Sequence, residues 1–152
     1  MFHSFVDEMQ KIAASRLQGK IDFQGLPISI ENKKGSHRSG KDREGNPWKT
    51  LMRAHYGYIR KNRQIRATGK DSEPIDVFVG SDKNSDLVVG IDLLKEDGSL
   101  DETKFFLGYK SPKAAIASFK LHYPKKWKQM LGEHRSMTMD EFKTQLSKDQ
   151  KV

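Results

Sequence analysis

The stretch DSEPIDVFVG, residues 71–80, brings three carboxylates and a proline to the beginning of an apolar strand. Carboxylates this close repel one another, and a bound divalent cation would explain why they are kept together. Because residues alternate sides along a strand, a bend at Pro74 would let Asp71, Glu73 and Asp76 converge on one face. The alternative is a solvated turn, because Asp is common in turns.

The charges around this stretch are segregated along the chain. Residues 33–70 carry twelve Lys or Arg against two acids, residues 71–102 carry ten acids against two bases, and residues 103–152 carry eleven bases against four acids. This order suits a metal held among phosphates. The net charge of +8 indicates a polyanionic partner, which could be nucleic acid, a nucleotide, pyrophosphate or a membrane surface.

Composition narrows the chemistry further. The 152 residues suffice for one domain with a buried core, and they include no cysteine. Any metal must therefore be bound by oxygen or imidazole, which favours hard cations such as Mg²⁺. No apolar run approaches the roughly 20 residues that span a bilayer, and the first ten residues lack a leader pattern. We therefore expect a soluble, cytoplasmic protein without a membrane partner.

Apolar patterning on both sides of residues 71–80 predicts a mainly β chain. We expect strands around residues 21–23, 27–31, 48–52, 56–59, 75–79, 87–94 and 104–109, and a polar, cationic loop up to residue 47. Apolar residues at helical intervals predict an amphipathic helix over 2–17. Ser111 and Pro112 begin a helix that runs to about residue 122, and a capping box from Thr138 to Glu141 begins the last one.

This order of elements predicts an α+β fold that is mainly β. We expect a small, five-stranded OB-like barrel over about residues 20–109, with the N-terminal helix and two C-terminal helices over about 111–147 packed outside it. The whole chain, 1–152, would form a single domain.

A second acidic group, residues 96–102, lies in a predicted hairpin turn that could face the first group across the barrel mouth, with Lys104 pointing at the same space. Its alternative is again a solvated turn. Tyr56 could equally be a core residue, and the cations after residue 122 could simply stabilise a helix C-terminus. The sequence contains no P-loop, no GxGxxG motif and no evident Ser/His/Asp nucleophile set, which argues against nucleophilic catalysis by a protein side chain.

Three motifs carry a resemblance to a known family. HYGYI (55–59) followed by DSEPIDVFVG resembles the signature region of the family I soluble inorganic pyrophosphatases. EDGSLDETK (96–104) is similar to the acidic hairpin of that family, which ends in a lysine, and LHYPKKW (121–127) to its helix-borne tyrosine and lysine. The order of the pieces is most similar to compact pyrophosphatase-like domains of bacteriophage and mobile-element proteins. The resemblance extends from about residue 28 to residue 142.

The resemblance implies Mg²⁺-dependent hydrolysis of pyrophosphate to two orthophosphates, in the host cytoplasm if the chain is phage-encoded. Glu73 and Asp76 would be catalytic. The implied metal ligands are Asp71, Glu73, Asp76, Asp97, either Asp101 or Glu102, and Glu31 at an outer site. The implied phosphate-binding residues are Tyr56, Lys104, Tyr123, Lys125 or Lys126, and also Arg38 and Lys33. The family normally has aspartate where this chain has Glu73, and the extra methylene could displace the base by about 1 Å and reduce or retune activity.

Two other functions remain open at this stage. A non-catalytic OB-like module could bind single-stranded nucleic acid through its basic loops and aromatic residues, without Mg²⁺ and with a steep salt dependence. Alanine at Arg60, Lys61 and Arg63 would then weaken this binding. The same fold could instead hydrolyse a nucleotide or another diphosphate.

Overall fold

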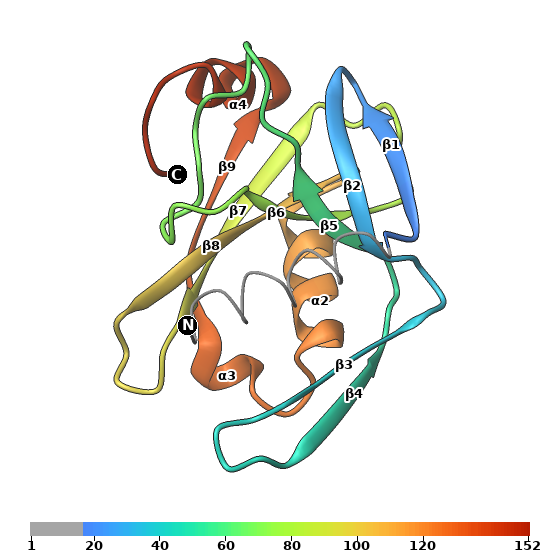
Figure 1. Ribbon diagram of the computed structural model, residues 1–152, viewed down its shortest axis with the longest axis vertical. Helices are drawn as coiled ribbons and strands as arrows, with labels where there is room; N and C mark the ends of the chain where they lie inside the picture. The colour runs from blue at the N-terminus through green and yellow to red at the C-terminus, as the bar shows by residue number, and fades with distance from the viewer. Residues whose placement is uncertain (1–16) are drawn as a thin grey trace, which may run out of the picture.

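The computed structural model describes residues 17–152, which form a mainly β fold with three helices (Figure 1). The strands are β1 (Gly19–Phe23), β2 (Leu26–Asn32), β3 (His37–Lys41), β4 (Pro47–Leu51), β5 (His55–Ile59), β6 (Asp76–Val79), β7 (Leu87–Leu94), β8 (Leu100–Leu107) and β9 (Leu131–Thr138). The helices are α2 (Pro112–His122), α3 (Trp127–Met130) and α4 (Met139–Leu146).

Seven of the strands form one mixed sheet in the order β1-β2-β5-β6-β8-β7-β9. All neighbouring pairs are antiparallel except β6 and β8, which are parallel. β3 and β4 form a separate two-stranded hairpin, at the end of the molecule opposite α4 (Figure 1). Within residues 17–152, β1 and β9 do not pair with each other, so the sheet is open. The predicted α+β, mainly β class is confirmed, whereas the five-stranded barrel is not.

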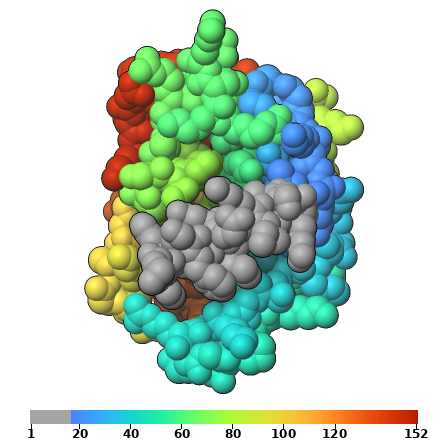
Figure 2. Space-filling model, viewed as in Figure 1, coloured from blue at the N-terminus to red at the C-terminus, as the bar shows by residue number. Residues whose placement is uncertain are grey.

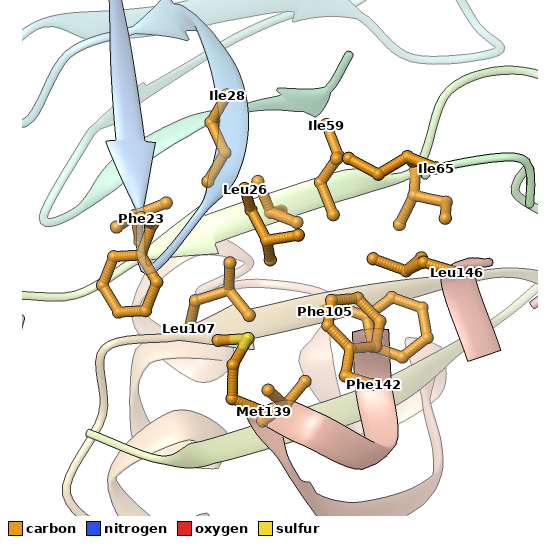
Figure 3. Close-up of a cluster of buried hydrophobic side chains, with 14 of the residues drawn as sticks. Phe23, Leu26, Ile28, Ile59, Ile65, Phe105, Leu107, Met139, Phe142 and Leu146 are labelled. Atoms are coloured by element: carbon orange, nitrogen blue, oxygen red, sulfur yellow. The ribbon is translucent and has the colours of Figure 1, made fainter. Parts of the chain in front are cut away.

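The two faces of the sheet bury two separate apolar clusters. One cluster joins β1, β2 and β8 to α4, and Figure 3 shows Phe23, Leu26 and Phe105 converging with Phe142 and Leu146 of the helix. The other cluster joins the opposite face to α2 and is rich in aromatic residues: Tyr56, Phe78, Phe106 and Phe119. Since Phe105 and Phe106 lie on opposite faces, strand alternation places Lys104 and Glu102 on the same face as Phe106, beside the aromatic cluster.

Close backbone contact aligns the strands that flank this aromatic cluster. A Cβ atom at Gly57 would lie 1.8 Å from the carbonyl oxygen of Ser29, so no residue but glycine fits between β2 and β5 at this point. The register pairs Tyr56 with Phe78, and Tyr58 with Asp76. The side chains of Tyr56 and Asp76 therefore emerge on the same face of the sheet.

Several sequence predictions differ from the observed elements. The loop expected up to residue 47 contains β3, and neither β9 nor α3 was expected. β8 begins at Leu100 rather than at residue 104, so that the hairpin turn closes over residues 95–99, where Lys95 N–H donates to the Ser99 carbonyl at 2.8 Å. The predicted Ser111 and Thr138 caps both form. The helix predicted over 2–17 falls almost entirely outside the described residues.

Candidate functional site

A buried ammonium lies at the centre of the candidate site. Lys104 of β8 has a side chain that is 3% exposed, and its Nζ atom lies 2.8 Å from Glu102 Oε1 and 3.2 Å from Asp76 Oδ2. Nζ also donates a hydrogen bond of 2.5 Å to the Tyr56 hydroxyl. Burial alone would lower the pKa of Lys104, but the phenol oxygens of Tyr56 and Tyr123 and the two carboxylates outweigh it and raise this pKa well above its ordinary value. The ammonium therefore stays charged.

A second cation reaches the same place from the β3–β4 hairpin. The Arg38 guanidinium carbon lies 4.5 Å from the centre of the Tyr56 ring, which also packs in a tilted arrangement on Phe78, with the ring centres 4.7 Å apart. Burial opposes the charge of Arg38, but Tyr56, Tyr123, Asp76 and other neighbours raise its pKa. Burial also raises the pKa of Tyr56, more than Lys104 lowers it, so the phenol remains neutral.

Tyr123 adds a buried hydroxyl without a partner. It caps the C-terminus of α2, and its ring packs against Phe119 at 4.9 Å and edge-on against Phe78 at 6.5 Å. Within residues 17–152, its hydroxyl is the one buried side-chain polar atom that makes no hydrogen bond. Tyr123 is near enough to Lys104 and Arg38 to affect the pKa of both. A buried polar atom without a partner calls for an explanation, and a ligand oxygen would supply one.

Carboxylates crowd around the two cations. Burial and then the charge of Asp76 raise the pKa of Glu31, more than Arg38 and Lys104 lower it. Because the Glu31 side chain is still exposed, solvent screens part of this effect. Burial raises the pKa of Glu102 as well, against the effect of Lys104 and together with the charges of Asp76 and Asp71. Four carboxylates thus form one electrostatically connected group, in which Asp76 acts on both Glu31 and Glu102, and Asp71 acts on Glu102.

The acidic stretch forms a tight turn in front of β6. Asp71 Oδ1 accepts a hydrogen bond of 3.0 Å from the backbone N–H of Glu73, and Gly69 N–H donates to the Glu73 carbonyl at 2.8 Å. Ser72 has a positive φ of 68°, which a residue with a side chain adopts at some cost. Asp71 and Asp76 both act on Glu102, and Asp71 and Glu73 are both exposed. The convergence expected of the three carboxylates is therefore visible for two of them.

The donor set suits a hard cation in its chemistry. Oxygen ligands are present, and a divalent cation would favour the charged forms of Glu31 and Glu102, whose pKa values are raised first by burial and then by neighbouring carboxylates. In the described part of the chain, however, no three His, Asp or Glu side chains lie close enough together to hold a metal ion. Binding would thus have to draw the carboxylates together.

Some of the predicted site residues lie outside this cluster. Asp97 Oδ1 accepts hydrogen bonds from Ser99 Oγ at 2.5 Å and from Ser99 N–H at 2.9 Å, and these bonds lower the pKa of Asp97. Asp101 precedes Glu102 on β8 and so lies on the opposite face, which favours Glu102 of the two alternatives. Lys33 lies near His55, since burial and then the charge of Lys33 lower the pKa of that histidine. Lys125 and Lys126 are exposed between α2 and α3.

Sequence reasoning missed His122, which fixes the helix that carries Tyr123. His122 Nε2 accepts a hydrogen bond of 3.0 Å from Arg53 N–H, and Nδ1 lies 2.7 Å from the Ser118 carbonyl. An acceptor at Nε2 and a donor at Nδ1 define a neutral imidazole, in agreement with the lowering of the His122 pKa by burial. Its only sequence signal was its position, immediately before Tyr123.

A cleft of about 1020 Å³ lies elsewhere. It is lined by residues of the β1–β2 hairpin, the beginning of β5 and α2, among them Phe23, His55 and Ser118. None of Glu31, Arg38, Tyr56, Asp76, Glu102, Lys104 or Tyr123 lines it. We therefore assign the candidate site from the geometry of the charged cluster and not from the volume of the cleft.

In the described residues, no helix is long and apolar enough to cross a membrane.

Comparison with known proteins agrees with the resemblance. The model of the inorganic pyrophosphatase family matches residues 8–147. No curated protein and no solved structure matches the chain. The family match spans every described element from β1 to α4 and includes the whole charged cluster. Because it covers most of the sequence, the chain belongs to the inorganic pyrophosphatase family.

Proposed function

We propose that the chain hydrolyses inorganic pyrophosphate to two orthophosphates in a Mg²⁺-dependent reaction, with water as the nucleophile. The family match supports a pyrophosphatase-like hydrolase. The observation that carries the substrate is the buried Tyr123 hydroxyl, which has no hydrogen-bond partner among the described residues and lies near the charged groups of Lys104 and Arg38. Phosphate oxygens would satisfy the hydroxyl and both cations together.

The carboxylates divide the remaining work. Asp71, Asp76 and Glu102 are our proposed Mg²⁺ ligands, with Glu31 at an outer position. When bound, Mg²⁺ would neutralise phosphate charge and make water more acidic. A bound cation would oppose the burial and carboxylate charges that raise the pKa values of Glu31 and Glu102, and so would lower both pKa values.

The side chains of the cluster would act on the two phosphates in different ways. Lys104 and Arg38 would stabilise the negative charge that develops on the leaving phosphate, and their burial strengthens this interaction. The neutral Tyr56 phenol accepts from Lys104 Nζ and so fixes the direction of the ammonium. Glu73 would accept the proton of the attacking water at its carboxylate. Its present exposure leaves it free to approach the substrate.

The test is orthophosphate release from magnesium pyrophosphate. Wild-type protein should release orthophosphate, and Asp76→Asn should abolish the release, because the change removes a charge between Lys104 and the proposed metal. Asp140→Asn is the matched control, because Asp140 is exposed in the first turn of α4, on another element. Equal release by wild type and Asp76→Asn would contradict the proposal.

A comparison of substrates completes this test. Faster turnover of nucleoside triphosphates than of pyrophosphate would move the substrate assignment to nucleotides while leaving the hydrolase assignment intact. If the protein bound DNA or RNA in Mg²⁺-free buffer and hydrolysed neither pyrophosphate nor nucleoside triphosphates, the nucleic-acid-binding alternative would be favoured instead.

A further inference from the structure

The β3–β4 hairpin delivers Arg38 to the site, and a single glycine shapes how it does so. The register pairs Gly40 of β3 with Trp48 of β4. A Cβ atom at Gly40 would lie 2.6 Å from Trp48 Cζ2 and 2.9 Å from Cε2. The indole therefore lies directly over the glycine backbone, in space that any other residue would fill.

The indole seated on Gly40 also contacts Arg38. Arg38 and Gly40 are two positions apart on β3, so they share a face of the hairpin. The Arg38 guanidinium carbon lies 5.4 Å from the centre of the Trp48 ring and 4.5 Å from the centre of the Tyr56 ring. Both distances are within the range of cation–π attraction. One aromatic ring thus belongs to the hairpin and the other to the main sheet.

Aromatic rings, rather than carboxylates, hold this guanidinium. None of the ion pairs found among residues 17–152 involves Arg38. A cation–π contact uses the face of the guanidinium and leaves its five N–H donors in the plane available. The contacts that position Arg38 in the cluster therefore leave its N–H donors available for a ligand.

Trp48 is a large apolar side chain that stays partly exposed to solvent, and packing within the hairpin alone does not explain its presence there. The residue is 38% exposed on a strand whose other positions are mostly polar or exposed. The β3–β4 hairpin forms the lower end of the molecule in Figure 2, in cyan. Contact with Arg38 gives the indole a role at that place.

We infer that Trp48 is a positioning residue, which acts through Arg38 and rests on the proposed function. Seated on Gly40, it holds the guanidinium over Tyr56 with its N–H donors free for a phosphate. Loss of one exposed cation–π contact should weaken phosphate binding by roughly two- to fivefold. Because Trp48 acts through Arg38, which would stabilise the charge developing on the leaving phosphate, its loss should lower kcat/KM for pyrophosphate by a similar factor.

The experiment measures the affinity for inorganic phosphate by calorimetry, and KM and kcat for pyrophosphate, in the full-length chain. Trp48→Leu should weaken phosphate binding, Trp48→Phe should keep most of the affinity, and Gly40→Ala should reproduce Trp48→Leu by displacing the indole. Leu51→Ala is the matched control, because Leu51 is also exposed on β4 but alternates to the other face.

A double-mutant cycle separates positioning from a merely structural role. In an Arg38→Ala background, Trp48→Leu should have no further effect on phosphate affinity or on kcat/KM. Additive losses, or an equal loss in Leu51→Ala, would overturn the inference.

The two kinds of failure are distinguishable. Coupled phosphate binding without orthophosphate release would remove the proposed function and leave the positioning role standing. Release with an additive cycle would remove the positioning role alone. Wild-type protein that neither binds phosphate nor hydrolyses pyrophosphate would remove both.

Discussion

Glu73 is the residue at which this chain departs from the pattern that its acidic stretch otherwise follows. Glu73 is exposed, as Asp71 is, and Asp71 and Asp76 both act on Glu102. Glu73→Asp should raise the rate of orthophosphate release, by about tenfold, because a misplacement of the base by 1 Å is costly to positioning. Glu73→Gln should reduce release to background. Steady-state kcat values would check both, and a Gln variant as active as wild type would exclude Glu73 as the base.

Glu31 couples the site to the stability of the fold. Burial and the charge of Asp76 raise its pKa above the ordinary 4.5. Such a carboxyl contributes stability fully below about pH 4.5 and loses it as the pH rises through the raised pKa. In metal-free buffer, Glu31→Gln should therefore be more stable than wild type near pH 7 and about equally stable near pH 4.

Urea unfolding across that pH range would measure the Glu31 effect. Glu44→Gln is a suitable control, because Glu44 is exposed in the turn between β3 and β4. A stability difference between wild type and Glu31→Gln that does not change with pH would show that the Glu31 carboxyl is not desolvated by folding.

At the scale of elements, the sequence predicted what apolar alternation encodes. β2, β6 and β7 each bury several Ile, Val or Leu residues, β5 buries Tyr56 and Ile59, and the positions of all four agree with the predicted strands. β3 (HRSGK) and β9 (LGEHRSMT) have mostly exposed, polar residues, so their strand structure comes from pairing with β4 and β7 and not from burial. An open sheet instead of a barrel depends on such pairings, which periodicity does not reveal.

The sequence likewise predicted only part of the candidate site. Lys104, Asp76 and Tyr56 belong to motifs that combine charge with a strand, and the structure brings all three together. The position of Asp97 was less accessible to prediction, because its Oδ1 accepts both hydrogen bonds from Ser99 in the turn. His122 contributes through backbone partners from distant segments, and no spacing in the sequence announces such contacts.

His122 makes the position of α2 sensitive to pH. Burial lowers its pKa below the ordinary 6.5, and Arg53 N–H occupies the nitrogen that protonation would need. A histidine with a lowered pKa contributes stability that is full above about pH 6.5 and is lost as the pH falls, because the unfolded chain binds the proton first. His122→Gln should therefore lose less stability than wild type between about pH 8 and pH 5.

Chemical denaturation at the two pH values measures this loss. His134→Gln, at an exposed position on β9, should keep the wild-type dependence on pH. If His122→Gln and wild type lose the same free energy of unfolding, the imidazole does not act as the buried acceptor that joins α2 to Arg53.

At the scale of the whole molecule, strand order converts a segregated charge sequence into one cluster. β2, β5, β6 and β8 are consecutive neighbours in the sheet, and they carry Glu31, Tyr56, Asp76 and Lys104 respectively. Residues that are far apart in the chain thus form a row across adjacent strands. The β3–β4 hairpin and the end of α2 add Arg38 and Tyr123. The cationic and anionic segments come together because the strand order of the sheet places them side by side.

This arrangement makes Lys104 the counter-ion of the carboxylates in the absence of metal. Asp76 and Glu102 side chains are only 25% and 20% exposed, and both lie within 3.2 Å of Lys104 Nζ. Lys104→Met would leave these carboxylates facing each other without a cation, and removal of one partner of a buried pair costs about 3–5 kcal/mol. Millimolar Mg²⁺ should restore part of that loss, because the vacated position lies between two hard oxygen donors.

Urea unfolding with Mg²⁺ or with a chelator tests this substitution of one cation for another. Mg²⁺ should raise the unfolding free energy of Lys104→Met more than that of wild type, whose carboxylates already have a partner in Lys104. Lys148→Met, at an exposed position after α4, should respond to Mg²⁺ as wild type does. An equal response of Lys104→Met and wild type would mean that Asp76 and Glu102 serve only to neutralise the lysine, and the metal would then have to bind elsewhere.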